Sequence, residues 1–367
     1  MTTNVEIYLG GTMSHINLDW QNLGFEYHET PYRYVANYQD QHWCEGEMTT
    51  SNAIPLNESA AVLQYCQTIF EGLKAYRTQD GRVVTFRPDL NAQRMIDSAL
   101  RLEMPAISKD QFLEAISEVI THNIDYIPPY GSGASLYIRP YMFATTPLIG
   151  VKPANDYQFR VFASPVGPYF TGGVRALTLC VAESDRSAPR GTGHIKAGLN
   201  YAMSLHALMD AKHRGYDENM YLDSATRTYV EETGGANFIF VTKDGTVVTP
   251  KSTTILPSIT RRSLLEVAVR YFGMKVEERP VAWSELSEYA ECGLCGTAAV
   301  LSPVGKIVRA QVSDPHTGVL VREEEVVQFP SGMEGRGPVT QKLYETLVGI
   351  QYGEIEAPEG WIYELAQ

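Results

Sequence analysis

The sequence predicts an α+β protein of two domains, a smaller N-terminal α/β domain and a larger C-terminal domain whose barrel-like sheet is flanked by helices. The chain has 367 residues, which exceeds the size at which one hydrophobic core usually stops growing. Residues 165–174 contain two prolines and three glycines that interrupt otherwise periodic sequence. The balance of strand and helix patterns differs on the two sides of this stretch. We therefore expect domains at 1–168 and 177–367, joined by an interdomain linker at 169–176.

Helices and strands are mixed in the N-terminal part. Asp89 begins an amphipathic pattern that predicts a helix over 89–104, and a second helix of the same period is expected at 109–125. The strand patterns, rich in aromatic and β-branched residues, cover 82–88, 134–145 and 157–166.

Strands dominate the C-terminal part. They are expected at 176–182, 219–232, 237–250 and 292–308, with turns such as KDGT at 243–246 between them. Helices are expected at 200–215, 258–273 and 338–353. A closed or nearly closed sheet flanked by helices is the simplest arrangement of these elements.

Charge and hydropathy exclude several classes of partner. The net charge of −13 argues against nucleic acid and against anionic membranes, because both require a basic surface. No apolar run approaches the roughly 18–20 residues of a membrane span, and the N-terminus lacks the pattern of an export signal. We therefore expect a cytoplasmic protein that contacts neither nucleic acid nor membrane.

Five scattered cysteines fit a reducing compartment better than a disulfide framework. Cys292 and Cys295 form a CxxC pattern, but a structural zinc site would need a second pair, and the following sequence reads as a turn and a strand. We interpret both as small buried residues and expect no metal site.

A lysine among glycines is the first candidate for chemistry. Lys196 lies in GTGHIKAGLNYAMS (191–204), where glycines leave space for a ligand or for backbone. A neutral lysine amine can form a Schiff base with a carbonyl compound. A solvated lysine in a surface loop is the alternative interpretation.

Two further features complement an amine of this kind. Ser258 precedes a helix whose first amides, those of Ile259 and Thr260, suit a phosphate, although an ordinary serine cap is the alternative. The acidic pair Glu231 and Glu232 runs into a Gly-Gly turn and could be a polar strand end or the partner of a protonated ring nitrogen. An amine, a phosphate site and a carboxylate are what a protein needs to hold pyridoxal 5′-phosphate.

Eight blocks in order then resemble one known family. LQYCQTIFEGLKAYR, FRPDLNAQRMIDSALRLEMP, YIRPYMFAT, GTGHIKAGLNYA, EETGGANFIF, ILPSITRRSLL, GTAAVLSPVG and IQYGEIEAPEGWIYEL are similar to blocks of the branched-chain-amino-acid aminotransferases, which are fold type IV pyridoxal-phosphate enzymes. The likeness extends from about residue 20 to the C-terminus and is strongest to the longer bacterial form.

The resemblance implies a role for each cofactor residue. Lys196 would form the internal aldimine and later carry the proton, Tyr201 would bind the phenolic oxygen, and Glu232 would face the pyridine nitrogen. Arg94 and the amides of Ile259 and Thr260 would hold the phosphate, together with Thr297.

The substrate residues implied by the resemblance combine aromatic walls with polar groups. Tyr137 and the amides of Thr297 and Ala298 would hold the α-carboxylate, and Arg139 would meet the second carboxylate of glutamate. The wall positions would be Phe25, Tyr65, Phe70 and Tyr169, for which plain core packing is the alternative.

The implied reaction is a ping-pong transamination between L-leucine, L-isoleucine or L-valine and 2-oxoglutarate, which yields glutamate, by a homodimer. The alternatives within the fold are a D-amino-acid aminotransferase and an aminodeoxychorismate lyase. A non-catalytic phosphate-binding or CxxC redox module is the alternative from another class.

Overall fold

The computed structural model describes residues 5–9, 12–16, 18–167, 174–313 and 320–365, and the chain forms two compact units. The first unit contains residues 1–171, 195–198 and 349–367, and the second contains 172–194 and 199–348. The α+β fold class is confirmed, since each unit combines a sheet with helices. Most of the predicted linker lies outside the described residues.

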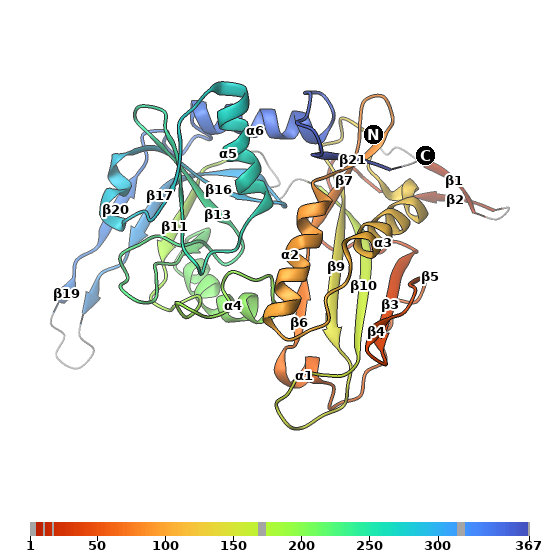
Figure 1. The fold of residues 1–367 in the computed structure, drawn as a ribbon. Coiled ribbons are helices and arrows are strands. Elements are labelled where there is room, and N and C mark those ends of the chain that lie inside the picture. The colour runs from red at the N-terminus through yellow and green to blue at the C-terminus, as the bar shows by residue number, and fades with distance from the viewer. Residues whose placement is uncertain (1–4, 10–11, 17, 168–173, 314–319, 366–367) are drawn as a thin grey trace. The chain divides into compact units, whose positions relative to one another are not determined.

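The first unit is built on an antiparallel sheet with the strand order β21-β8-β7-β9-β10-β3-β4, to which β5 adds at β3 and β6 at β9 (Figure 1). Its strands are β3 (Arg33–Gln39), β4 (His42–Trp43), β5 (Glu47–Thr49), β6 (Thr68–Phe70), β7 (Leu73–Arg77), β8 (Val83–Phe86), β9 (Ser135–Ala144), β10 (Tyr157–Val166) and β21 (Ile362–Glu364). A separate hairpin is formed by β1 (Val5–Leu9) and β2 (Thr12–Ile16).

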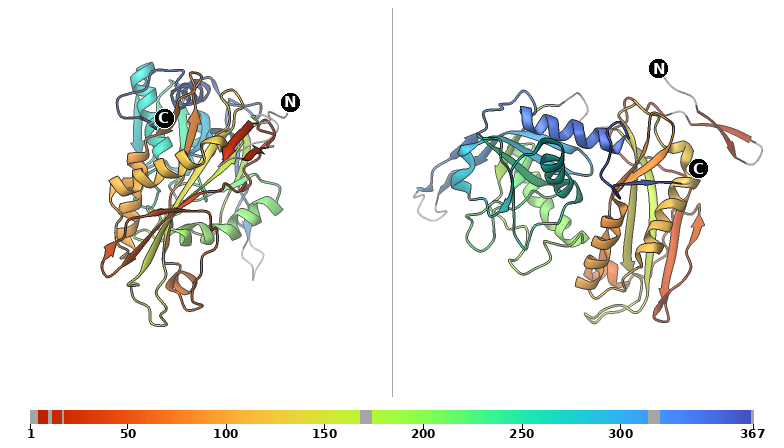
Figure 2. Two further views of the ribbon diagram at one scale, coloured as in Figure 1. Left: turned by 90° about the vertical axis from the view of Figure 1, so that its right-hand side faces the viewer. Right: turned by 45° about the horizontal axis from the view of Figure 1, so that its top comes forward.

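Helices α2 (Pro88–Arg101) and α3 (Lys109–His122) cover one face of this sheet, as Figure 2 shows from two further directions. Phe112 of α3 is fully buried and its ring lies 6.1 Å from that of Phe159 on β10. This unit also contains the short helix α1 (Ala61–Tyr65) and the 3-10 turn η1 (Ile124–Tyr126). The other face of β9 and β10 therefore remains available for functional side chains.

The start of α2 differs from the prediction by its capping residue. Pro88 is the first helical residue, preceded by Arg87 at φ 49°, so Asp89 lies inside the first turn. Proline suits this position because its missing amide hydrogen would have no partner there and its φ is already helical.

The second unit is built on a mixed sheet with the order β12-β11-β17-β16-β13-β14-β15, and β20 pairs with β17. Its strands are β11 (Leu177–Val181), β12 (Glu218–Met220), β13 (Asn237–Thr242), β14 (Val247–Pro250), β15 (Val276–Arg279), β16 (Tyr289–Gly296), β17 (Val300–Arg309) and β20 (Glu325–Gln328). A second pair, β18 (Val312–Ser313) and β19 (Leu320–Arg322), is separate from it. The strand expected over 219–232 is thus reduced to β12, because Asp223 accepts backbone bonds from Thr228 and Tyr229 and turns the chain.

Helix α5 (Ile259–Phe272) contacts β13, β15 and β16, while α4 (Gly198–His213) and α6 (Pro338–Gln351) occupy the positions predicted for helices. A short 3-10 helix, η2 (Trp283–Glu288), precedes β16. Gly273 ends α5 at φ 61°, a conformation that a residue without Cβ adopts without strain.

Two segments join the first unit instead of the second, which contained them in the predicted division. Strand β21 pairs with β8, and Tyr352 donates from its hydroxyl to the carbonyl of Ala134, so the C-terminal segment belongs to the first sheet. Ala197 forms a bridge with Ile69 of β6, which draws residues 195–198 into the same unit.

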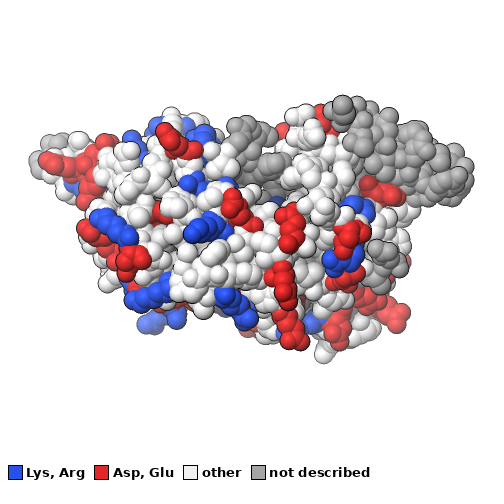
Figure 3. All heavy atoms as spheres, turned by 90° about the horizontal axis from the view of Figure 1, so that it is seen from above, with Lys and Arg blue, Asp and Glu red and all other residues white. Residues whose placement is uncertain are grey.

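Charged side chains of both signs are interspersed over the described residues on the face drawn in Figure 3. Among the described residues, no helix is both long enough and apolar enough to span a bilayer. All five cysteines are free thiols, and Cys292 and Cys295 are buried as predicted.

Candidate active site

The segment that carries Lys196 is fixed by backbone contacts within the first unit. The amide of Lys196 donates to Oγ of Ser98 on α2 at 3.0 Å, and its carbonyl accepts from the amide of Phe70 at 3.0 Å. A Cβ at Gly198 would lie 3.3 Å from Thr68, so the glycine permits this close approach. The main chain of the lysine is thus held on both sides, while its side chain is partly exposed.

Five predicted residues gather in the first unit. Nζ of Lys196 lies 4.8 Å from the centre of the Phe70 ring, and the guanidinium of Arg139 lies 4.9 Å from the same ring. Arg139 also donates from Nη2 to the Tyr137 hydroxyl at 3.0 Å, and Phe25 meets Tyr137 edge to face at 5.4 Å. An amine, a guanidinium and three aromatic rings therefore form one cluster, which we call the aromatic–arginine cluster.

The position of Tyr137 depends on a glycine that sequence reasoning did not single out. A Cβ at Gly72 would lie 2.0 Å from the Tyr137 hydroxyl oxygen, so only glycine admits the ring at this place. Lys74 lies opposite Tyr137 in the pairing of β7 with β9, and burial lowers its pKa to about 8. Lys74 is thus a second, buried amine beside the cluster. Nothing in the sequence around it predicted that it would be buried there.

Arg94 is held by a carboxylate that sequence reasoning also missed. Its Nε and Nη2 donate to the two oxygens of Glu71 at 2.7 Å each, and both side chains are buried. Asn91, one turn earlier on α2, adds a bond of 2.8 Å to the same carboxylate. The bidentate pair fixes the plane of the guanidinium, since two parallel bonds leave it no rotation.

The carboxylate of Glu232 is buried in the second unit. Its Oε1 accepts from the Leu256 amide at 2.8 Å and from Arg186 at 2.9 Å, and its Oε2 accepts from Asn237 at 2.7 Å. Burial raises the pKa of Glu232 to about 7, although Arg186 acts in the opposite direction. A carboxylate has about four acceptor sites, so Oε2 keeps capacity for one more donor.

Arg186 links Glu232 to the glycine loop. Besides Glu232, its Nη1 reaches the carbonyls of Gly193 and Thr254 at 3.1 Å each. A Cβ at Gly193 would lie 2.2 Å from the Thr254 carbonyl oxygen, which explains a glycine there. Glu231 is buried as well, but its carboxylate accepts from Thr254 and Ser252. The two glutamates therefore have different partners, and the choice of Glu232 rather than Glu231 for the ring nitrogen stays a prediction.

The N-terminus of α5 offers two donors. The Ser258 hydroxyl caps the helix by accepting from the Arg261 amide at 3.2 Å. Among the described residues, the amides of Ile259 and Thr260 have no hydrogen-bond acceptor, and both residues are nine-tenths or more buried. Buried amides at a helix N-terminus favour an anion, since they carry the positive end of the helix dipole.

The remaining predicted residues are less informative. Tyr201 lies on the first turns of α4, and Thr297 and Ala298 lie in the turn between β16 and β17. The hydroxyl of Tyr65 donates to the Ile149 carbonyl, and its side chain is exposed. Tyr169 lies outside the described residues. Within the described part of the chain, no group of three or more His, Cys, Asp or Glu residues is arranged to hold a metal ion.

Comparisons with known proteins show which family the sequence is similar to. The sequence matches the family described as Amino-transferase class IV over residues 68–307. It is 44% identical over 351 residues to a branched-chain-amino-acid aminotransferase of Helicobacter pylori, covering 95% of this chain and 98% of that protein. It is 45% identical over 357 residues to one of Haemophilus influenzae, covering 95% of this chain and 99% of that protein.

Solved structures agree with the sequence matches. The branched-chain amino acid aminotransferase from Escherichia coli is 28% identical, with a TM-score of 0.71 over 91% of this chain and 99% of that chain. A second branched-chain amino acid aminotransferase, complexed with N-(5′-phosphopyridoxyl)-L-glutamate, is 26% identical, with a TM-score of 0.73 over 92% of this chain and 100% of that chain.

Proposed function

This chain belongs to the class IV aminotransferase family, among the branched-chain-amino-acid aminotransferases, and from that membership we propose that it exchanges the amino group of L-leucine, L-isoleucine or L-valine with 2-oxoglutarate. The enzyme uses pyridoxal 5′-phosphate, as the family and the ligands of its structural relatives indicate. The observation that carries the proposal is the aromatic–arginine cluster beside Lys196, because it combines apolar walls with a charge for a second carboxylate.

The residues of each unit fit this cofactor. In the second unit, the buried amides of Ile259 and Thr260 suit a phosphate, and the spare acceptor site of Glu232 suits a protonated ring nitrogen. In the first unit, Arg94 is a fixed, buried cation and Lys196 supplies the amine. We assign Tyr201 to the phenolic oxygen and Thr297 to the phosphate, as the resemblance implies.

When bound, the cofactor supplies an electron sink that lets the α-proton of an amino acid leave. Lys196 would hold the cofactor through Nζ, and its neutral amine would be able to accept a proton. Nζ of Lys196 would take up the α-proton of the substrate and later give a proton back. The backbone bonds to Ser98 and Phe70 keep the lysine main chain in place during this exchange, so only the side chain has to move.

Glu232 would keep the ring nitrogen of the cofactor protonated. Its raised pKa reflects a buried carboxylate whose charge is only partly balanced by Arg186, so a second positive group beside it is favourable. Arg186 and Asn237 orient the carboxylate through hydrogen bonds to both oxygens. Arg186 and Asn237 are therefore positioning residues, which act on the cofactor through Glu232.

One cluster serves two kinds of substrate. Aliphatic side chains pack on Phe70 and on the ring of Tyr137, with Phe25, Tyr65 and Tyr169 as further walls. The guanidinium of Arg139 lies over the Phe70 ring and has an Nε atom that is buried without a hydrogen-bond partner among the described residues. It meets the second carboxylate of glutamate or 2-oxoglutarate. We assign the Tyr137 hydroxyl and the amides of Thr297 and Ala298 to the α-carboxylate, as the resemblance implies.

We also propose that the enzyme is a cytoplasmic homodimer. Five free thiols support a reducing compartment, and members of the family resembled by the sequence assemble as dimers.

A substrate comparison tests the proposed function. L-Leucine, D-alanine and aminodeoxychorismate are assayed side by side, with 2-oxoglutarate as acceptor for the two amino acids. We expect turnover with L-leucine to exceed the others by orders of magnitude. Faster consumption of D-alanine or of aminodeoxychorismate would replace the proposal by one of the alternatives.

The variant Arg139→Met sharpens this test. It is expected to raise KM for 2-oxoglutarate at least about tenfold, with a smaller change for L-leucine, because only the former brings a second carboxylate. The matched control Arg82→Met removes a partly exposed arginine that pairs with Asp80 and Glu364, and it should leave both values unchanged.

A further inference from the structure

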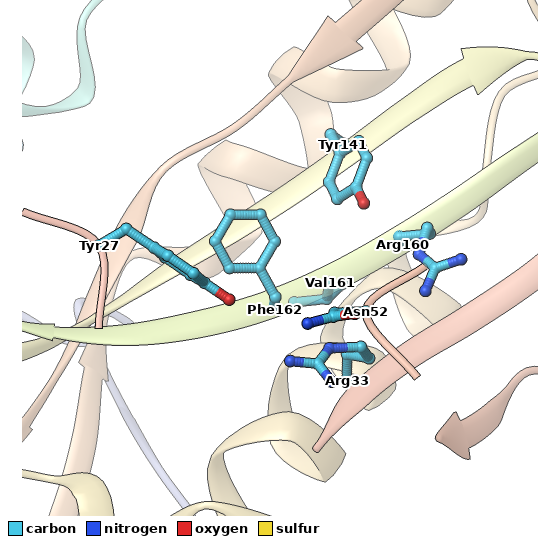
Figure 4. Close-up of a pocket in the computed structure, with 7 residues that line it drawn as sticks. All are labelled: Tyr27, Arg33, Asn52, Tyr141, Arg160, Val161 and Phe162. Atoms are coloured by element: carbon cyan, nitrogen blue, oxygen red, sulfur yellow. The ribbon is translucent and has the colours of Figure 1, made fainter. Parts of the chain in front are cut away.

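A pocket of about 290 Å³ lies on the face of the first-unit sheet that the helices leave uncovered (Figure 4). Its volume is at the low end of pockets that bind small molecules. None of its lining residues has a role in the proposed reaction. They are Tyr27, Arg33, Asn52, Tyr141, Arg160, Val161 and Phe162.

The strand register brings two arginines to this pocket. Arg160 of β10 lies opposite Val35 of β3 and opposite Tyr141 of β9. Arg33 precedes Val35 by two residues, so its side chain leaves the same face of the sheet and is the diagonal neighbour of Arg160. Both side chains are about 95% buried, with exposed fractions of 4% for Arg33 and 5% for Arg160.

Arg160 has no carboxylate partner among the described residues. Its Nη1 donates to the Gln158 side chain at 2.9 Å and its Nη2 to the Ser51 carbonyl at 3.1 Å, and both acceptors are neutral. Burial lowers the pKa of the Arg160 guanidinium, and the charge of Arg33 lowers it further. A buried charge without a counterion is costly, so this side chain favours an anion in the space that it faces.

Arg33 is only partly neutralised. Its Nη2 donates to Glu29 at 3.3 Å, but the Glu29 side chain is 52% exposed and also accepts from Asn52 at 2.7 Å. The remaining bonds of Arg33 go to the carbonyls of Thr30 and Thr50. Two buried cations thus line the pocket, and only Arg33 has a carboxylate partner, which leaves an excess of positive charge there.

The rest of the lining is aromatic. Phe162 meets Tyr27 edge to face at 5.8 Å and Tyr141 edge to face at 5.9 Å. Figure 4 shows these rings on one side of the pocket, and the arginines and Asn52 on the other. A ligand with an apolar body and one anionic end would match both sides, whereas inorganic phosphate would leave the rings without contact.

We propose that this pocket binds a small organic monocarboxylate, with its carboxylate between Arg33 and Arg160 and its apolar body against Tyr27, Tyr141 and Phe162. A free amino acid fits less well, since its ammonium group would be repelled by the two guanidinium groups. The inference does not depend on the proposed reaction.

Calorimetric titration of the full-length holoenzyme tests the pocket, with benzoate as the probe and benzamide as its neutral counterpart. Benzamide is expected to bind at least about tenfold more weakly, because it lacks the charge-assisted hydrogen bonds. Arg160→Met should weaken benzoate by a similar factor. Tyr27→Leu, which changes a 59% exposed ring and so preserves folding, should weaken it about threefold. The control Arg82→Met should bind benzoate as the unchanged protein does.

Several results would overturn the proposal. If the unchanged protein, Arg160→Met and Tyr27→Leu bound benzoate with equal affinity, the pocket would not be the binding site. Loss of binding in Arg139→Met, with Arg160→Met unaffected, would place the probe in the reaction site. If Arg160→Met weakened the binding of inorganic phosphate and benzoate did not bind, the site would be one for bare anions. A weaker dimer in Arg160→Met would instead assign the pocket to a second copy of the chain.

Discussion

Replacing Glu232 with glutamine should remove a pH dependence from the folding stability of the cofactor-free protein. Glu232 is buried, with an exposed fraction of 2% for the residue. Burial raises its pKa from 4.5 to about 7. Glutamine keeps the size and most hydrogen bonds of the side chain but cannot ionise. The variant therefore isolates the cost of the charge.

The sign and size follow from the two pKa values. Between pH 4.5 and about 7 the folded chain holds a proton that the unfolded chain has released, so stability falls as the pH rises through this window. A difference of this size corresponds to roughly 3 kcal/mol between pH 4.5 and pH 8. Over this pH range, the melting temperature of the unchanged protein should therefore fall by roughly 6–12 °C more than that of Glu232→Gln, for a folding unit of this size.

Thermal unfolding of both proteins, freed of cofactor, measures the effect between pH 5 and pH 8. The difference in melting temperature between the unchanged protein and Glu232→Gln should vary with pH. Glu288→Gln serves as the control, because that side chain is 76% exposed. Adding pyridoxal 5′-phosphate should flatten the slope of the unchanged protein, since a protonated ring nitrogen keeps Glu232 ionised. Curves for the two proteins that run parallel across the range would refute the reasoning.

Three further outcomes are expected. Glu71→Gln leaves the buried Arg94 without its carboxylate and should lower stability by about 3–5 kcal/mol in urea unfolding, and an unchanged midpoint would contradict the buried pair. Gly72→Ala should displace Tyr137 and raise KM for L-leucine at least about tenfold, while the cofactor absorbance is retained. If the kinetics matched those of the unchanged enzyme, the Tyr137 ring would tolerate a Cβ at position 72. Exposed Cys66 should react with iodoacetamide before the buried thiols, and mass spectrometry of the native protein would show the opposite order if the burial pattern were wrong.

Sequence patterns predicted the elements whose periodicity is local. The strand expected at 157–166 is β10, and the helix expected at 258–273 is α5 with its Ser258 cap. Strand β21 was missed because it has only three residues and its partner β8 lies far away in the sequence. Such a strand is defined by pairing and has no pattern of its own.

In the candidate site, too, some residues could be predicted from the sequence and others could not. Family blocks indicated Lys196, Arg94 and Glu232, but they did not indicate their partners Glu71 and Arg186. Arg186 lies in a loop, and its burial depends on a carboxylate that follows 46 positions later, Glu232. A charged loop residue is normally solvated, so nothing in its neighbourhood signals this contact.

The arginines of the pocket illustrate the same limit. Arg160 alternates with apolar residues on β10 and reads as an outward-facing, solvated side chain. It is buried only because residues near 27 and 52 in the sequence fold over the sheet face. Burial by distant loops cannot be derived from strand periodicity alone.

Borohydride reduction of the holoenzyme followed by peptide mass spectrometry tests the central claim most directly, because it fixes the cofactor to the amine that holds it. The account predicts a pyridoxyl group on the peptide that contains Lys196, and none on the peptide that contains Lys74, the other amine near the aromatic–arginine cluster. A label on Lys74, or a Lys196 peptide that stays unmodified in protein loaded with pyridoxal 5′-phosphate, would contradict it.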